Sequence, residues 1–280
     1  MQNLNNLITS PVFIKQFADL YLERKSESQW QAMTRNAQPY IVKARNKFRG
    51  FFYQQLDECV KYLNNQKSIK ILSADDAINW EQWNIQFEEF GQLLLTDIIS
   101  QWGPEILGTI TAGISFDVDF PYIQDFIKEH SFKMAINVNE TTKERLRELF
   151  TRAITAGDSV PQIEKQLKVM FADVGKIRAN MIARSEVIRA HNAGAESAYI
   201  ESGVVQYKQW WTSKGERRTC RFCNALHGKI IIVGMNYFSL GDRYELINEA
   251  GKKEILKINY SDIRYPPLHV RCRCCLLPVI

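Results

Sequence analysis

The sequence predicts an α+β protein, in which a mostly helical N-terminal region precedes helices packed on a small antiparallel sheet tied by a Cys/His metal site. Three observations support this fold class. Apolar residues recur with a helical period along most of the chain as far as residue 202. The apolar period then changes to two, as in half-buried strands. Finally, five of the six cysteines lie within residues 220–275, in two clusters. We expect the boundary between the two regions at residues 138 and 139.

The N-terminal region, residues 1–138, begins with a helix whose clearest apolar periodicity covers residues 40–64. A second helix is expected to begin with the capping residues that follow Ser73. Its aromatic stripe runs over residues 80–102, and we expect it to end at the Gly-Pro pair at 103 and 104. Packing against neighbouring helices explains this stripe better than a ligand groove does.

Five further helical segments follow, and turn residues separate most of them. A short element over residues 104–113 and a helix over 119–130 complete the N-terminal region. The next three helices are expected over residues 141–156, 158–171 and 176–202. The first and third of these are each followed by a glycine, which commonly ends a helix.

Four strands are expected after the last of these helices, because apolar residues alternate there and turn residues punctuate them. They cover residues 204–211, 229–233, 253–258 and 272–279. Residues 234–251 are interpreted as a long excursion between strands. A layer this small has little apolar area to bury, and a bound metal is one means of stabilising it.

The two cysteine clusters have the spacing of metal half-sites. Cys220 and Cys223 form a CxxC pair, and His269 and Cys272 form an HxxC pair with Cys274 close behind. Two such half-sites supply the four ligands of a tetrahedral structural zinc. A bend in the chain would select His269, whereas a straight strand would place Cys272 and Cys274 on one face. Both choices for the fourth ligand remain open.

The alternatives to a structural zinc site are less well supported by the sequence. The chain starts without the basic and apolar pattern of a secretion signal, so metal or free thiols are favoured over disulfides. Cys275 is expected to pack as a small apolar residue. His227 has acceptable ligand spacing but also suits a turn. A catalytic zinc would want a neighbouring carboxylate, which the flanking residues do not supply.

Charge is divided unevenly along the chain, since residues 1–175 carry a net −3 and residues 176–280 a net +8. The basic excess permits contact with phosphate groups, although an ordinary solvated face is an equal alternative. The candidate nucleic-acid-binding residues are Arg217, Arg218, Arg221, Arg271 and Arg273. No apolar run approaches the ~20 residues of a membrane span, so no membrane partner is expected.

The helix expected over residues 176–202 carries the best candidates for catalysis, and they do not form a catalytic set. Glu186 is spaced to pair with Arg189 on the helix surface, and His191 has no evident partner in sequence. We interpret Arg184, Glu186 and Asn192 as structural residues that satisfy backbone groups of the β layer. No glycine-rich phosphate-binding motif is present, and we predict no catalytic residues and no enzymatic activity.

A series of motifs in the C-terminal half resembles one known family in order and spacing. These motifs are the run from Ala183 to Gly194 (ARSEVIRAHNAG), then Gly203-Val204, Arg218-Thr219-Cys220-x2-Cys223, Leu226-x-Gly228-Lys229, and Pro267-Leu268-His269-x2-Cys272-Arg273-Cys274. Together they are similar to the domain of the phage Mu F-like head morphogenesis (minor capsid) proteins. The resemblance covers roughly residues 140–280, with departures at Ser185, His227 and Val270.

The resemblance implies a phage or prophage minor head protein that associates with the portal and is present in few copies. Such a protein would assist head morphogenesis and DNA packaging or delivery without being an enzyme. Its expected place is the virion, in the capsid interior or at the portal vertex, after assembly in the host cytoplasm. Its partners would be the portal, other head proteins and packaged DNA. Residues 139–280 would then be the Mu F-like domain. The alternatives are a zinc-stabilised nucleic-acid-binding module and a metal-dependent hydrolase or nuclease.

Overall fold

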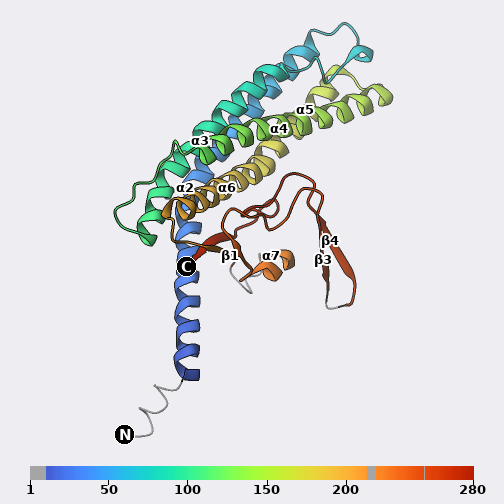
Figure 1. The fold of residues 1–280 in the computed structure, drawn as a ribbon. Helices are drawn as coiled ribbons and strands as arrows, with labels where there is room; N and C mark the ends of the chain where they lie inside the picture. Colours follow the sequence, from blue (N-terminus) through green and yellow to red (C-terminus); the bar gives the residue numbers. More distant parts are fainter. Residues whose placement is uncertain (1–10, 213–218, 249) are drawn as a thin grey trace.

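The structure is a computed structural model that describes residues 11–212, 219–248 and 250–280. It consists of an elongated helical body and a smaller β region that lies along one side of it (Figure 1). The longer helices are α2 (Pro11–Asn64), α3 (Trp80–Ile110), α4 (Pro121–Ala156), α5 (Val160–Asp173) and α6 (Ala179–Ser202). Three short helical elements are η1 (Ile69–Ile71), η2 (Val174–Arg178) and α7 (Arg221–Leu226). The strands are β1 (Tyr207–Trp211), β2 (Ile230–Ile232), β3 (Arg243–Ile247), β4 (Lys253–Lys257) and β5 (Cys275–Val279). The predicted α+β class is confirmed.

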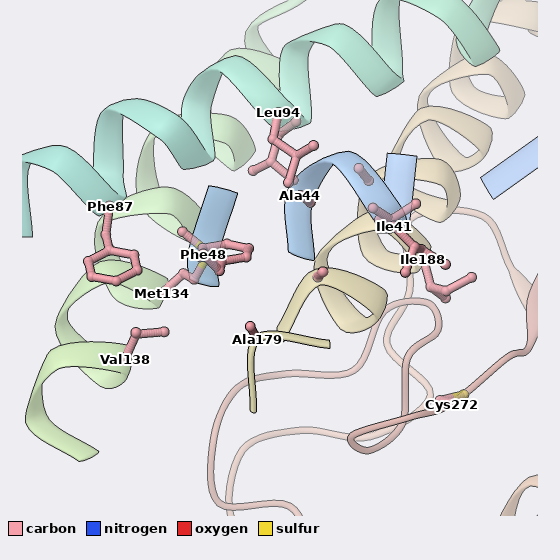
Figure 2. Close-up of a cluster of buried hydrophobic side chains, with 14 of the residues drawn as sticks. Ile41, Ala44, Phe48, Phe87, Leu94, Met134, Val138, Ala179, Ile188 and Cys272 are labelled. Carbon is pink, nitrogen blue, oxygen red and sulfur yellow. The ribbon is translucent and has the colours of Figure 1, made fainter. Parts of the chain in front are cut away.

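The core of the helical body forms where α6 packs against α2 and α3, and α3 packs against α4. Phe48 from α2 and Phe87 from α3 are fully buried, and their rings stack with centroids 5.9 Å apart. The same cluster contains Leu94 from α3, Val138 from α4 and Ile188 from α6 (Figure 2). Each such side chain contributes about 1.5–3 kcal/mol by leaving water, so this body is stabilised chiefly by apolar burial.

Helix α3 does not end at the Gly-Pro pair, which corrects one expectation. It continues to Ile110, with Trp102, Gly103 and Leu107 all buried. A Cβ at Gly103 would lie 2.3 Å from the ring of Phe116, so this glycine permits close packing and does not stop the helix. Tertiary packing on both sides of Pro104 therefore outweighs the local cost of proline in a helix.

Helix α4 joins two segments that were expected to be separate helices. Its middle is held by a buried amide chain, in which Gln55 donates to Asn139 at 2.9 Å and Asn139 donates to Asn84 at 2.7 Å. Thr142 accepts a hydrogen bond from buried Arg178 at 2.8 Å. The expected boundary at residues 138 and 139 falls inside this helix. Buried residues on both sides of it belong to one hydrophobic cluster.

Two helix C-termini lie where the sequence predicts them, whereas one N-terminus does not. Gly157 and Gly203 both adopt left-handed φ angles, 69° and 65°, and end α4 and α6 as expected. The start of α3 was placed too early, because its N-cap is Asn79 and not Ser73. The Asn79 side chain accepts a hydrogen bond from the backbone of Gln82 at 3.1 Å.

The β region contains two small sheets. The first has the order β2-β1-β5, with antiparallel pairing of Tyr207 to Val279 and of Trp211 to Cys275. The second is the hairpin β3-β4. Strand β3 lies in the segment that was interpreted as an excursion. Its sequence, RYELI, does alternate, with Tyr244 and Leu246 half-buried between exposed residues, but this strand signal is only five residues long.

Candidate metal centre

The first half-site is built on the short helix α7. Cys220 is its N-cap residue, and its Sγ accepts a hydrogen bond from the backbone N–H of Cys223 at 3.4 Å. This cap turns the chain so that both sulfurs lie on the same side of the helix start. Cys223 is buried, whereas Cys220 is partly exposed.

The second half-site is a turn that leads into β5. The backbone N–H of Cys272 donates to the carbonyl of His269 at 3.1 Å, and Arg271 between them has φ 67°. The chain therefore bends between His269 and Cys272, as the histidine-containing ligand set requires. Figure 2 shows Cys272 on this loop beside the end of the helical core.

The two half-sites meet at distances that suit a shared ion. His269 Nε2 lies 3.0 Å from Cys220 Sγ and 3.2 Å from Cys223 Sγ. The sulfurs of Cys223 and Cys272 are 3.8 Å apart. Ligand sulfurs at about 2.3 Å from a tetrahedral zinc are about 3.8 Å from each other. The donor types and their spacing therefore fit zinc.

All five predicted ligands come together around one sulfur atom. One group of mutually close donors is Cys220, Cys223 and His269, and the other is Cys223, Cys272 and Cys274. Cys223 belongs to both groups. Because neither group contains a carboxylate among the described residues, the site has the composition of a structural zinc centre.

The orientation of His269 is set by its other ring nitrogen. Nδ1 lies 2.7 Å from the carbonyl oxygen of Val270, which leaves Nε2 directed at the cysteines. Metal-binding histidines commonly anchor the second nitrogen on a carbonyl in this way, because the contact fixes the tautomer and the ring angle.

The pKa shifts differ among the cysteines of the cluster: those of Cys220 and Cys272 are lowered, whereas hydrogen bonds to neighbouring thiols raise that of Cys223 and burial raises that of Cys274. Hydrogen bonds from Cys223 and His269 lower the pKa of Cys220 to about 4, although burial acts in the opposite direction. Burial lowers the pKa of His269, but its contacts with Cys220 and Cys272 outweigh this and raise the pKa to about 9. Thiolate is the form of cysteine that binds metals, so a bound cation would displace the protons that its ligands among Cys223, Cys274 and His269 hold in its absence.

The remaining cysteine and histidine candidates have other roles. Cys275 pairs with Trp211 in the sheet, and burial raises its pKa, as for an inert core thiol. His227 accepts a hydrogen bond from the backbone of Thr212 at 3.3 Å and packs on Trp211. Neither belongs to the two groups of close donors.

Asn192, on α6, connects the helical body to the strand that follows the cysteine turn. Its side chain donates to the carbonyl of Cys274 at 3.3 Å and accepts from the N–H of Leu276 at 2.7 Å. Tyr199 adds a hydrogen bond to the carbonyl of Leu276 at 3.1 Å. The free edge of β5 is therefore bonded by side chains of α6.

Glu186 is buried and has a partner that sequence spacing did not predict. His130 Nε2 lies 2.5 Å from its carboxylate, while Arg189 is 3.9 Å away. Burial acts to raise the pKa of Glu186, but the charge and hydrogen bond of His130 outweigh this and lower it. Arg184 is half-buried on the same helix.

The candidate nucleic-acid-binding arginines are not gathered into one free patch in the described part of the chain. Arg221 forms a 2.6 Å ion pair with Glu254, and Arg271 is exposed on the cysteine turn. The backbone carbonyl of Arg273 accepts a hydrogen bond from Trp30. Arg217 and Arg218 lie outside the described residues.

A buried ion pair in the β region was missed from sequence. Lys208 of β1 and Glu196 of α6 are both fully buried, with Nζ 2.7 and 2.8 Å from the two carboxylate oxygens. Lys208 also donates to the carbonyl of Arg264, and the N–H of Gly234 donates to Glu196. The available signal was the position of Lys208, next to Trp210 on the inward-facing side of a strand.

No helix in the described part of the chain has the length and apolar character needed to cross a membrane.

Fold and site together define a mostly helical α+β protein whose C-terminal part contains a Cys/His cluster. Residues 144–277 match the model of the family described as Phage Mu protein F like protein. This C-terminal segment is therefore similar to the phage Mu F-like family. The matched segment contains both cysteine clusters, and the match indicates a relation to phage head morphogenesis proteins.

One relative among curated proteins is the uncharacterized protein YqbB of Bacillus subtilis (strain 168). It is 27% identical over 173 residues, which cover 62% of this chain and 54% of the relative. The match thus spans about half of the relative's length. No solved structure matches the chain significantly.

Proposed function

We propose that this protein is a zinc-stabilised minor head protein that associates with the portal and acts in head morphogenesis and DNA packaging or delivery. The observation that carries the proposal is the family match over residues 144–277, the segment that contains both cysteine clusters. The expected location is the capsid interior or the portal vertex.

In this proposal zinc is bound by Cys220, Cys223, Cys272 and His269. The imidazole is favoured as the fourth ligand because its Nε2 faces two of the sulfurs while its Nδ1 is anchored on a carbonyl. Cys274 would then lie beside the ligand sulfurs and donate a hydrogen bond to them. When bound, the metal supplies structural stability by linking α7 to the turn before β5.

Metal analysis of matched variants tests the ligand set. We expect about one zinc per chain in the wild type and in Cys274→Ser, and loss of zinc in His269→Ala. With cobalt in place of zinc, the absorption bands should indicate three sulfurs and one nitrogen. Zinc loss in Cys274→Ser with retention in His269→Ala would assign the fourth position to Cys274 instead.

Assembly experiments test the head role. Procapsids produced with the portal should contain the protein, and procapsids produced without the portal should lack it. Unchanged incorporation without the portal would contradict portal association. Retention on DNA at low salt that falls steeply as salt rises would instead support the nucleic-acid-binding alternative.

A further inference from the structure

A second site lies away from the cysteine cluster, in a cleft between α4 and the loops that flank β3 and β4. The cleft has a volume of about 530 Å³. Its lining includes His130 and Phe126 from α4, Arg189 from α6 and Tyr265 from the loop after β4. Helical body and β region therefore both contribute to it.

Arg189 is the unusual group in this cleft. Its Nε is buried and has no hydrogen-bond partner among the described atoms. The nearest carboxylate oxygen, on Glu186, is 3.9 Å away, which is too far for a hydrogen bond. A buried N–H on a charged group is costly to leave unpaired, so an acceptor from outside the chain would satisfy it.

The carboxylate of Glu186 does not satisfy this donor, because it lies 3.9 Å from Nε and is held by His130 at 2.5 Å. His130 in turn stacks on Phe126, with ring centroids 5.4 Å apart, and Phe126 meets Tyr265 edge-on at 6.0 Å. The base of the cleft thus combines aromatic walls with a guanidinium whose Nε has no hydrogen bond and whose nearest carboxylate is 3.9 Å away. This combination suits an anionic group attached to an apolar side chain.

The rim of the cleft restricts the ligand further. It carries three acidic residues, Asp125, Glu129 and Asp262, beside the basic Lys133 and Arg264. A polyanion such as nucleic acid would meet these carboxylates along its length and be repelled. A single carboxylate with basic residues on either side would instead be attracted at both places.

We propose that this cleft binds a peptide segment of a partner protein that presents one carboxylate to Arg189, an apolar side chain to the aromatic wall and basic residues to the rim. The site is separate from the metal centre, and the proposal goes beyond the head function because it names the chemistry of a partner contact.

The test uses the full-length protein and follows the arginine Nε–Hε signals by NMR. The probes are 3-phenylpropionate, its amide, inorganic phosphate and a single-stranded DNA 12-mer. We expect 3-phenylpropionate to shift the Arg189 signal, and the amide to bind at least tenfold more weakly. An acetylated Lys-Phe-Glu-Lys peptide amide should bind more tightly than its Glu→Gln form.

Arg189→Lys keeps the charge but removes the Nε donor, and we expect it to weaken 3-phenylpropionate binding at least tenfold. Arg221→Lys is the matched control, because Arg221 is exposed and paired with Glu254 elsewhere, and it should bind as the wild type does. If Arg189→Lys does not fold, the wild-type titrations with 3-phenylpropionate, its amide, phosphate and DNA still test the proposal. The proposal is overturned if the amide binds as well as the acid, or if phosphate or DNA shifts the Arg189 signal as strongly.

Discussion

The helical body and the β region share one apolar cluster but differ in how much polar links add to it. In the body, large aromatic and aliphatic side chains from α2, α3, α4 and α6 fill a continuous core. The β region has two small sheets of three and two strands, whose buried apolar residues join the same cluster. It adds polar links: the Cys/His cluster, the pair of Lys208 with Glu196, and the hydrogen bonds of Asn192. Apolar burial tolerates imperfect geometry better than these directional links do. Single substitutions should therefore have local, all-or-none effects in the β region and graded effects in the body.

The largest effect is expected from removing the sulfur that both donor groups share. Cys223→Ser should abolish zinc binding and unfold the β region, because structural zinc contributes on the order of 10 kcal/mol to small metal-dependent domains. Metal analysis and amide hydrogen exchange would measure this, with the helices of the body retaining their protection. Cys59→Ala, at a buried thiol in α2, should keep its zinc. Equal loss of protection in both regions would show that the two do not differ in this way.

The matching perturbation of the body is Phe87→Ala. Phe87 is fully buried and touches the rings of Phe48, Phe51 and Phe52, so the cavity should cost roughly 4 kcal/mol in the free energy of unfolding. Urea denaturation would measure the loss. Zinc content should be unchanged, and reduced zinc in this variant would show that the core and the metal site are coupled.

The buried ion pair allows a sharper test within the β region. Lys208→Met keeps the aliphatic stem but leaves Glu196 without its cation, and we expect a loss of about 3 kcal/mol. Burial already raises the pKa of Glu196, so the orphaned carboxyl should take up a proton. The double variant Lys208→Met with Glu196→Leu should recover part of the loss in urea denaturation. If the losses in the free energy of unfolding from the two single substitutions simply add in the double variant, Lys208 and Glu196 do not stabilise each other.

The smallest effect concerns pH and the junction between the regions. Burial lowers the pKa of His191, which packs on Trp102, to about 4. The unfolded chain, with a histidine pKa near 6.5, binds the proton more readily, so stability should fall as pH decreases from about 6.5 to about 4. The partial exposure of His191 reduces the expected loss to about 2 kcal/mol. Denaturation of the wild type and of His191→Phe should diverge over this range, and parallel curves would exclude a contribution from this residue.

The features that sequence predicted are those with local causes. Gly157 and Gly203 end helices because their backbone conformations require glycine, and the CxxC and HxxC spacings place donors together through one helical turn and one tight turn. The same locality explains the error at Gly103, where the local signal for a helix end was overruled by the ring of Phe116.

The features that sequence did not predict depend on residues far apart in the chain. His130 and Glu186 are separated by 56 positions, and the Arg189 cleft combines three elements. Neither arrangement has a periodic or spaced signature. Glu186 stood out in sequence as part of a motif, but its partner His130 could be identified only from the packing of α4 against α6.

The position of α6 determines how a force on the C-terminal segment of this chain would reach the helical body. This helix is held by the bundle on one side, and on the other Asn192 is bonded to Cys274 and Leu276. A slide of one helical turn, about 5.4 Å, would break both of these bonds at once. A force applied to the cysteine turn would therefore be transmitted to the helical body through α6. We expect the helical body and the β region to move together under such a force.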